Sequence, residues 1–139
     1  MTVVLFFTGL LAGFEVLVRY GLRVPLGELD QRTQIPFRKA LILRLRFLVP
    51  AAFLPAAVSA VVVAVMDGRP FLYAGLTALL VWAVATFGGT VPINSAALTW
   101  DPETPPDNWR TLVARWDRLD AVRTAAALVA FACFLVAAA

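Results

Sequence analysis

The side chains best suited to acid–base chemistry stand inside or beside strongly apolar stretches of this chain. Glu15 interrupts an apolar run near the N-terminus, and Asp120 and Arg123 stand at the start of another near the C-terminus. A carboxylate can remove a proton as a general base, and a guanidinium can stabilise the oxyanion that results. These three residues are candidates for catalysis, provided that the fold brings the two segments together.

An amide and two tryptophans accompany these charges in the second half of the chain. Asn94 follows a Gly-Gly-Thr-Val-Pro-Ile run, which predicts a weak or kinked helix end. Its amide could orient a carbonyl or enol group of a ligand. Trp109, Trp116 and Arg123 share one helical stripe, and indole rings there could stack on a flat substrate.

Each of these polar groups also has a purely structural interpretation. Glu15 could pair with Arg19, which follows one helical turn later. Without this pair, Arg19 would be free to bind a substrate oxygen. Asp120 and Arg123 could form a solvated ion pair where the last apolar segment begins. Asn94 could cap a helix end. The sequence leaves these alternatives open.

Composition and apolar segments indicate an integral membrane protein of the all-α class. Apolar residues make up 61% of the chain and charged residues 15%, against roughly 45–50% and 25% in average soluble proteins. A helix needs about 20 apolar residues to cross the hydrocarbon core of a bilayer. Four segments meet this length, at about residues 3–22, 47–66, 71–91 and 121–139. We therefore expect one domain, a four-helix bundle within the lipid bilayer.

The basic residues predict the orientation of this bundle. Eleven of the twelve lie at or between spans one and two or spans three and four, and one lies in the remaining connection. The first group comprises Arg19, Arg23, Arg32, Arg38, Lys39, Arg44, Arg46, Arg110, Arg115, Arg118 and Arg123, and the exception is Arg69. By the positive-inside rule, we expect the basic loops in the cytoplasm and both termini on the outer side of the cell membrane.

The last helix is expected to extend beyond the membrane. Thr104 is a suitable N-cap, Pro105 suits the first helical position, and Asp107 could complete a capping box. The helix would then begin near Pro105 in the cytoplasm. In the first span, Gly9 and Gly13 form a small-xxx-small motif that would permit a helix-packed homo-oligomer.

Several functional classes are excluded or disfavoured by composition. The chain has no histidine, only two methionines and one cysteine, Cys133, so common ligands for haem, zinc, copper or iron are missing and we expect neither metal nor other cofactor. The net charge of +3 arises from cations near helix ends, where contact with lipid headgroups is their ordinary use. We do not expect nucleic acid as a partner.

Several motifs together resemble those of a known family. They are Ala12-Gly13-Phe14-Glu15, Val91-Pro92-Ile93-Asn94, Trp100-Asp101-Pro102, Trp109 and Arg115-Trp116-x3-Asp120-x2-Arg123-Thr124. This pattern resembles the anthrone-oxygenase-like family of small four-span membrane proteins. Asn94, Trp116 and Arg123 match motif positions of the family, whereas Asp120 stands where histidine or asparagine is common.

The resemblance implies a cofactor-free oxygenase that converts anthrones to anthraquinones with molecular oxygen in polyketide biosynthesis. In such an enzyme Glu15 or Asp120 would be the base, Arg19 or Arg123 would stabilise the oxyanion, and Asn94 with the tryptophans would hold an apolar aromatic substrate. The same groups could instead catalyse cyclisation or isomerisation by acid–base chemistry. A third possibility is a non-catalytic membrane subunit or scaffold, in which the polar groups hold helices together.

Overall fold

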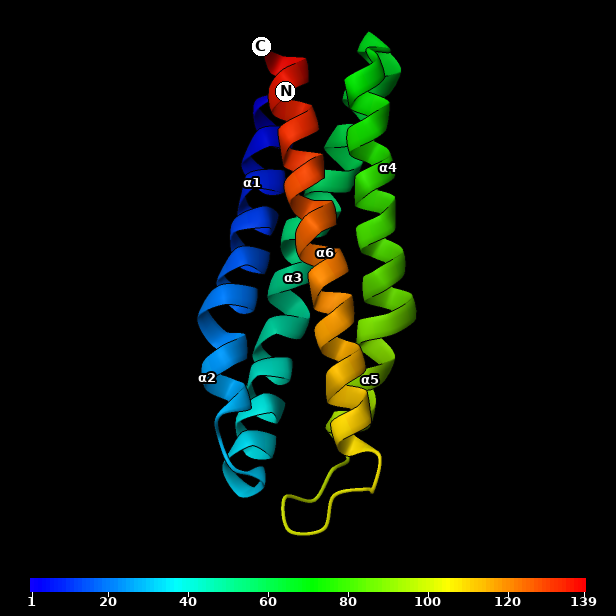
Figure 1. Cartoon of the computed structure of the whole chain (residues 1–139). Coiled ribbons are helices and arrows are strands. Elements are labelled where there is room, and N and C mark those ends of the chain that lie inside the picture. The colour runs from blue at the N-terminus through cyan, green and yellow to red at the C-terminus, as the bar shows by residue number, and fades with distance from the viewer.

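Four long helical rods run side by side along the whole molecule (Figure 1). The computed structural model describes residues 1–139, and it contains no strand. In chain order the elements are α1 (Thr2–Leu17), the π-helical segment η1 (Val18–Leu22), α2 (Arg23–Gly27), α3 (Gln31–Asp67), α4 (Pro70–Ala85), the π-helical segment η2 (Thr86–Thr90), α5 (Val91–Ala97) and α6 (Trp109–Ala138). The first three elements form one rod, and α4, η2 and α5 form another.

The four rods confirm the all-α, four-span architecture expected from the sequence. All four are long and apolar enough to cross a membrane. Their outer surfaces expose many large apolar side chains, among them Phe6, Phe47, Val65 and Leu80, which water would solvate poorly and lipid would cover well. Both termini lie at the same end of the bundle (Figure 1). We call the other end, which carries residues 28–30 and 98–108, the connection end.

The second rod extends well beyond its predicted span. We expected a bilayer-crossing segment from about residue 47, but α3 begins at Gln31. Asp30 caps it, accepting a hydrogen bond of 2.9 Å from the backbone nitrogen of Thr33. Hydrogen bonding from Thr33 also lowers the pKa of the Asp30 carboxyl, because it stabilises the charged form. The basic residues that precede the predicted span, Arg38, Lys39, Arg44 and Arg46, are therefore part of one continuous helix.

Two π-helical segments interrupt the rods at the same depth of the bundle. η1 directly follows the turn that carries Glu15, and η2 lies in the third rod close to the start of α5. A π turn holds an extra residue, so it changes which side chains face the neighbouring helices beyond it. Where the sequence predicts a weak or kinked helix end before Asn94, the structure has the π-helical segment η2, and the rod continues through it to Ala97.

The last helix begins later than predicted. α6 starts at Trp109, and Asn108 precedes it without a side-chain cap. The predicted capping box at Thr104 is wrong: the Thr104 hydroxyl donates to Asp101, and residues 101–108 form an irregular connection. Three prolines in this connection lack backbone donors, so it cannot form a regular helical turn. Trp109 instead packs edge-on against Trp100, with ring centroids 6.1 Å apart.

Close packing between α4 and α6 provides much of the core. Phe134 of α6 is fully buried, and a Cβ atom at Gly75 of α4 would lie 2.7 Å from its ring. Gly9 contacts Phe131 of α6 in a similar way, with a Cβ position 3.1 Å from the ring, whereas nothing lies within 4 Å of a Cβ at Gly13. The glycine at position 9 thus serves packing within the chain, and a homo-oligomer stays a prediction.

We predict that Gly75→Ala lowers the free energy of unfolding by about 1–3 kcal/mol, because the added methyl would overlap the fully buried ring of Phe134. Titration with sodium dodecyl sulfate, followed by circular dichroism, measures this difference. Gly13→Ala is the matched control, and it should be neutral or slightly stabilising. Equal stability of the two variants would show that α4 and α6 pack more loosely than described.

Candidate functional site

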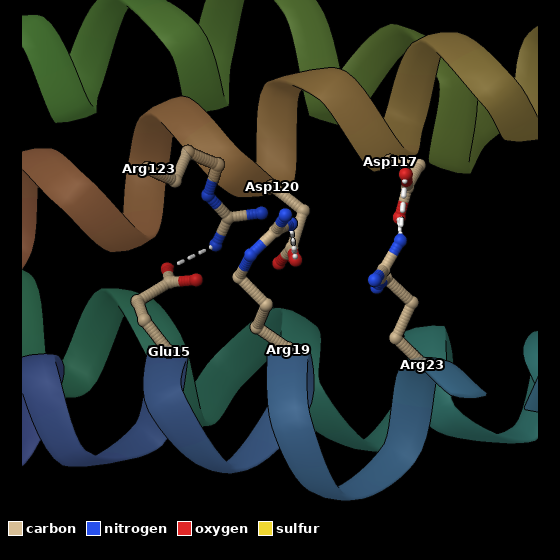
Figure 2. A network of polar contacts seen from close by, with 6 residues as sticks. All are labelled: Glu15, Arg19, Arg23, Asp117, Asp120 and Arg123. Carbon is tan, nitrogen blue, oxygen red and sulfur yellow. Dashed lines mark hydrogen bonds and ion pairs between the residues drawn. The ribbon is translucent and has the colours of Figure 1, made fainter. Parts of the chain in front are cut away.

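A buried ion pair joins the first and last rods in the middle of the bundle. Nη2 of Arg123 lies 2.6 Å from Oε1 of Glu15 (Figure 2). The indole Nε1 of Trp82 donates to the same oxygen at 2.8 Å, and the Arg123 guanidinium lies over the Trp82 ring, 5.3 Å from its centroid. Glu15 and Trp82 are fully buried, and Arg123 is 6% exposed. Three rods therefore meet at one carboxylate oxygen.

Two further ion pairs continue this contact toward the connection end. Arg19 Nη1 lies 3.3 Å from Oδ2 of Asp120, and Arg23 Nη1 lies 2.8 and 2.9 Å from the two oxygens of Asp117 (Figure 2). The first rod supplies side chains four residues apart and the antiparallel α6 supplies side chains three residues apart. Because η1 widens the first rod here, positions four residues apart stay on the face toward α6.

These contacts settle the pairings that the sequence left open. Glu15 does not pair with Arg19, and Asp120 does not pair with Arg123, although both pairs have suitable spacing within one helix. Each residue pairs across the bundle instead. The ion pairs therefore link the first rod to α6 and do not neutralise charge within either helix.

A cavity of about 410 Å³ lies beside the ion pair, in the half of the bundle nearer the connection end. This volume is in the range of small-molecule sites. The first rod, α3, η2, α5 and α6 all contribute to its wall, which is mostly apolar. Its apolar members include Phe14, Val18, Leu22, Leu41, Ile42, Leu45, Val49, Phe87 and Val91, and its polar members include Glu15, Arg38, Thr86, Thr90, Asn94 and Arg123.

Four of the seven predicted site residues line this cavity: Glu15, Asn94, Trp116 and Arg123. Asn94 is half-buried inside α5 and does not end a helix. The remaining three lie elsewhere. Arg19 and Asp120 pair with each other and do not line the cavity, and Trp109 packs with Ile35, Ala97 and Trp100 nearer the connection end.

Several buried polar atoms in the cavity wall lack hydrogen-bond partners. They are Oε2 of Glu15 and the hydroxyl oxygens of Thr86 and Thr90. Burying such atoms without a partner costs free energy, so they mark places where a ligand or water would bind favourably. The two threonines lie one turn apart in η2. The glutamate uses one oxygen for structural contacts and leaves the other without a partner.

Four residues of this site could not be identified from the sequence. Trp82 was hidden within an apolar span, although the indole N–H of a buried tryptophan needs an acceptor. Thr86 and Thr90 looked like ordinary span residues. Arg38 was assigned to lipid headgroups, yet its guanidinium stacks over Trp116, 5.1 Å from the ring centroid, and is buried. No group of three or more His, Cys, Asp or Glu side chains lies together.

Comparison with known proteins identifies the family of this chain. Residues 37–133 match the protein family described as anthrone oxygenase. The chain belongs to the anthrone oxygenase family. The matched segment covers more than half of the chain and includes Arg38, Asn94, Trp116 and Arg123, whereas Glu15 precedes it. No curated protein and no solved structure matches the chain.

We predict that Arg123→Gln lowers the free energy of unfolding by about 3–5 kcal/mol, because it leaves a buried carboxylate without its counter-charge. The double variant Glu15→Gln/Arg123→Gln should recover part of this loss, since neither charge then remains. Detergent-induced unfolding of the single and double variants completes the thermodynamic cycle.

The control for this cycle is Arg32→Gln, which breaks the pair between Arg32 and Glu103. That pair is 3.0 Å long, but its side chains are 73% and 60% exposed, so the change should cost at most about 1 kcal/mol. Strictly additive effects at Glu15 and Arg123 would contradict the coupling that the contact distance implies.

Proposed function

We propose that this protein is a membrane-embedded, cofactor-independent oxygenase that acts on apolar polycyclic phenols or ketones of the anthrone type. The observation that carries this proposal is the buried Glu15 carboxylate beside an apolar cavity, with one oxygen held by Arg123 and Trp82 and the other without a partner. A free carboxylate oxygen beside an apolar substrate is the arrangement that carbon-acid deprotonation requires. Membership of the anthrone oxygenase family supports the same reaction class.

The reaction begins with proton removal from the CH2 group that lies across the central ring from the anthrone carbonyl. Glu15 accepts this proton, and the electron pair of the C–H bond enters the ring system to give an enolate. The enolate donates two electrons to molecular oxygen and forms a C–O bond, and the peroxide anion takes the proton back from Glu15. Cleavage of the O–O bond with loss of the second C–H proton gives a second carbonyl and water. One anthrone and one oxygen molecule thus yield one anthraquinone and one water.

The remaining cavity residues would bind and orient the substrate. Asn94, half-buried in the cavity wall, is suited to hydrogen-bond the carbonyl, and Trp116 offers an indole face for the ring system. Arg123 lies close enough to Glu15 to stabilise negative charge that develops beside it. Arg19 and Asp120 do not line the cavity, so we assign them a positioning role through their mutual ion pair.

The same carboxylate also suits a reaction that does not consume oxygen. Proton transfer to and from one carbon-acid site would serve an isomerase or cyclase, because Glu15 can accept a proton and return it. Oxygen uptake distinguishes these reactions. In a non-catalytic membrane subunit, the ion pairs would serve only to hold the rods together.

For the location of the protein we propose the cell membrane, with the connection end in the cytoplasm and both termini outside. Most basic residues lie on the rods near that end, and the opposite turn carries only Arg69. An apolar substrate and oxygen would then reach the cavity from the lipid, and the protein would serve aromatic polyketide biosynthesis.

We predict that the purified protein in detergent accelerates oxygen uptake by an anthrone and the appearance of quinone absorbance. Glu15→Gln should lower turnover at least about a hundredfold, the usual contribution of a general base. Asp120→Asn should lower it less, because Asp120 does not line the cavity.

Glu28→Gln is the matched control, since Glu28 is exposed at the connection end and should leave turnover unchanged. Yield and circular dichroism of each variant show whether it folds. No acceleration over the spontaneous rate with several anthrones would disprove the oxygenase. A larger loss in Asp120→Asn than in Glu15→Gln would assign the base to Asp120 instead.

A further inference from the structure

Arg38 is the one buried arginine that takes part in no ion pair. Its side chain lies on α3, with 8% of its surface exposed. The five ion pairs of the chain involve other arginines, and Nε of Arg38 has no hydrogen-bond partner. By contrast, Arg44 and Arg46 of the same helix are exposed. A buried guanidinium without an anion is unfavourable by several kcal/mol, so its position calls for a partner.

The acidic groups nearest to the cavity are already engaged. Both oxygens of Asp117 bind Nη1 of Arg23, at 2.8 and 2.9 Å. Oε1 of Glu15 binds Arg123 and Trp82. The Arg38 guanidinium lies over the face of Trp116, which attracts a cation but does not neutralise it. Asp117 also attracts Arg38, but it forms its ion pair with Arg23 and none with Arg38. The chain itself therefore supplies no ion-pair partner for Arg38.

Arg38 stands where a ligand could supply that anion. It lines the cavity of about 410 Å³ and also a second cavity of about 320 Å³ on the side of the connection end, so it forms part of the wall between them. Arg23, Leu26 and Trp116 share this position. A planar guanidinium suits bidentate binding of a carboxylate, and an adjacent indole suits the aromatic ring that carries it.

We infer that Arg38 binds an anionic group of the substrate, a carboxylate or an ionised phenol, at the end of the cavity remote from Glu15. This inference deepens the proposed function, because it takes the cavity to be the substrate site. The substrate class is thereby narrowed to polycyclic aromatic acids.

The anionic group is distinct from the oxygen that takes part in the reaction. Trp116, against which Arg38 stacks, and Arg123, which pairs with Glu15, are seven residues apart on α6. Seven residues span about 10 Å along a helix. In an anthrone the carbonyl group and the reacting carbon lie on opposite sides of the same central ring, which is a much shorter separation. Arg38 therefore contacts a substituent on an outer ring, whereas the reacting centre lies beside Glu15.

A lipid phosphate could supply the same kind of negative charge. Headgroups would meet Arg44 first, which is exposed on the same helix and lines neither cavity. Arg38 instead lies between the two cavities, where Trp116 and Leu26 also line both. The burial of Arg38 thus favours a ligand within the cavity over a lipid at the surface.

The test compares two fluorescent probes that differ in one charge, anthracene-2-carboxylate and its methyl ester. Both are titrated into the full-length protein in phosphatidylcholine nanodiscs. Wild-type protein should bind the carboxylate at least about tenfold more tightly than the ester, since a charge-assisted hydrogen bond favours the acid. Arg38→Gln should lose this preference and still bind the ester, and Arg38→Lys should retain part of it. Arg44→Gln is the matched control and should keep the full preference.

The outcomes separate this inference from its alternatives. Equal binding of acid and ester by the wild type, or an unchanged preference in Arg38→Gln, would overturn it. Loss of the acid preference when phosphatidylglycerol replaces phosphatidylcholine would assign Arg38 to a lipid phosphate and also overturn it. Binding requires neither oxygen nor turnover, so a protein that prefers the acid but oxidises no anthrone would disprove the oxygenase and leave the anion site intact.

Discussion

The arrangement of the bundle depends on the neutralisation of one carboxylate within an apolar interior. Removing an ion from water costs several kcal/mol, and that cost is offset only when a partner lies in close, well-directed contact. Arg123 supplies this contact at 2.6 Å, and Trp82 adds a hydrogen bond to the same oxygen. The partners of Glu15 come from two other rods, so the requirement fixes the relative height of three rods at once. With the first rod and α6 held at these relative heights, Arg19 can pair with Asp120 and Arg23 with Asp117.

The spans could be predicted from sequence because membrane insertion depends on local hydrophobicity and length. The helix ends could not, because they depend on contacts between segments. α3 begins at Gln31 since Asp30 caps it, and α6 begins at Trp109 since that ring packs against Trp100. Ion pairing was ambiguous for a related reason: spacing within one helix is equally suitable for Glu15 with Arg19, and only the register of the rods selects Arg123.

The candidate site was predicted in part, and the two π segments explain much of the remainder. Residues with unusual polarity for their position, such as Glu15 and Asn94, could be recognised without a structure. Thr86 and Thr90 could not, because threonine is ordinary in a membrane helix and their orientation depends on η2. Arg38 was misassigned since basic residues near a span usually extend to the headgroups, and only packing shows that its guanidinium turns inward to Trp116.

In the proposed reaction, stability and reactivity make opposite demands on Glu15, and the geometry separates them between its two oxygens. A fully paired carboxylate would hold the rods together but would be a poor acceptor for a substrate proton. An unpaired one would be reactive but costly to bury. Here Oε1 receives both structural contacts and Oε2 receives none. The same residue can therefore fix the register of the bundle and keep one oxygen free of hydrogen bonds. In the proposed reaction, the arginine that stabilises the fold is also placed to stabilise developing charge.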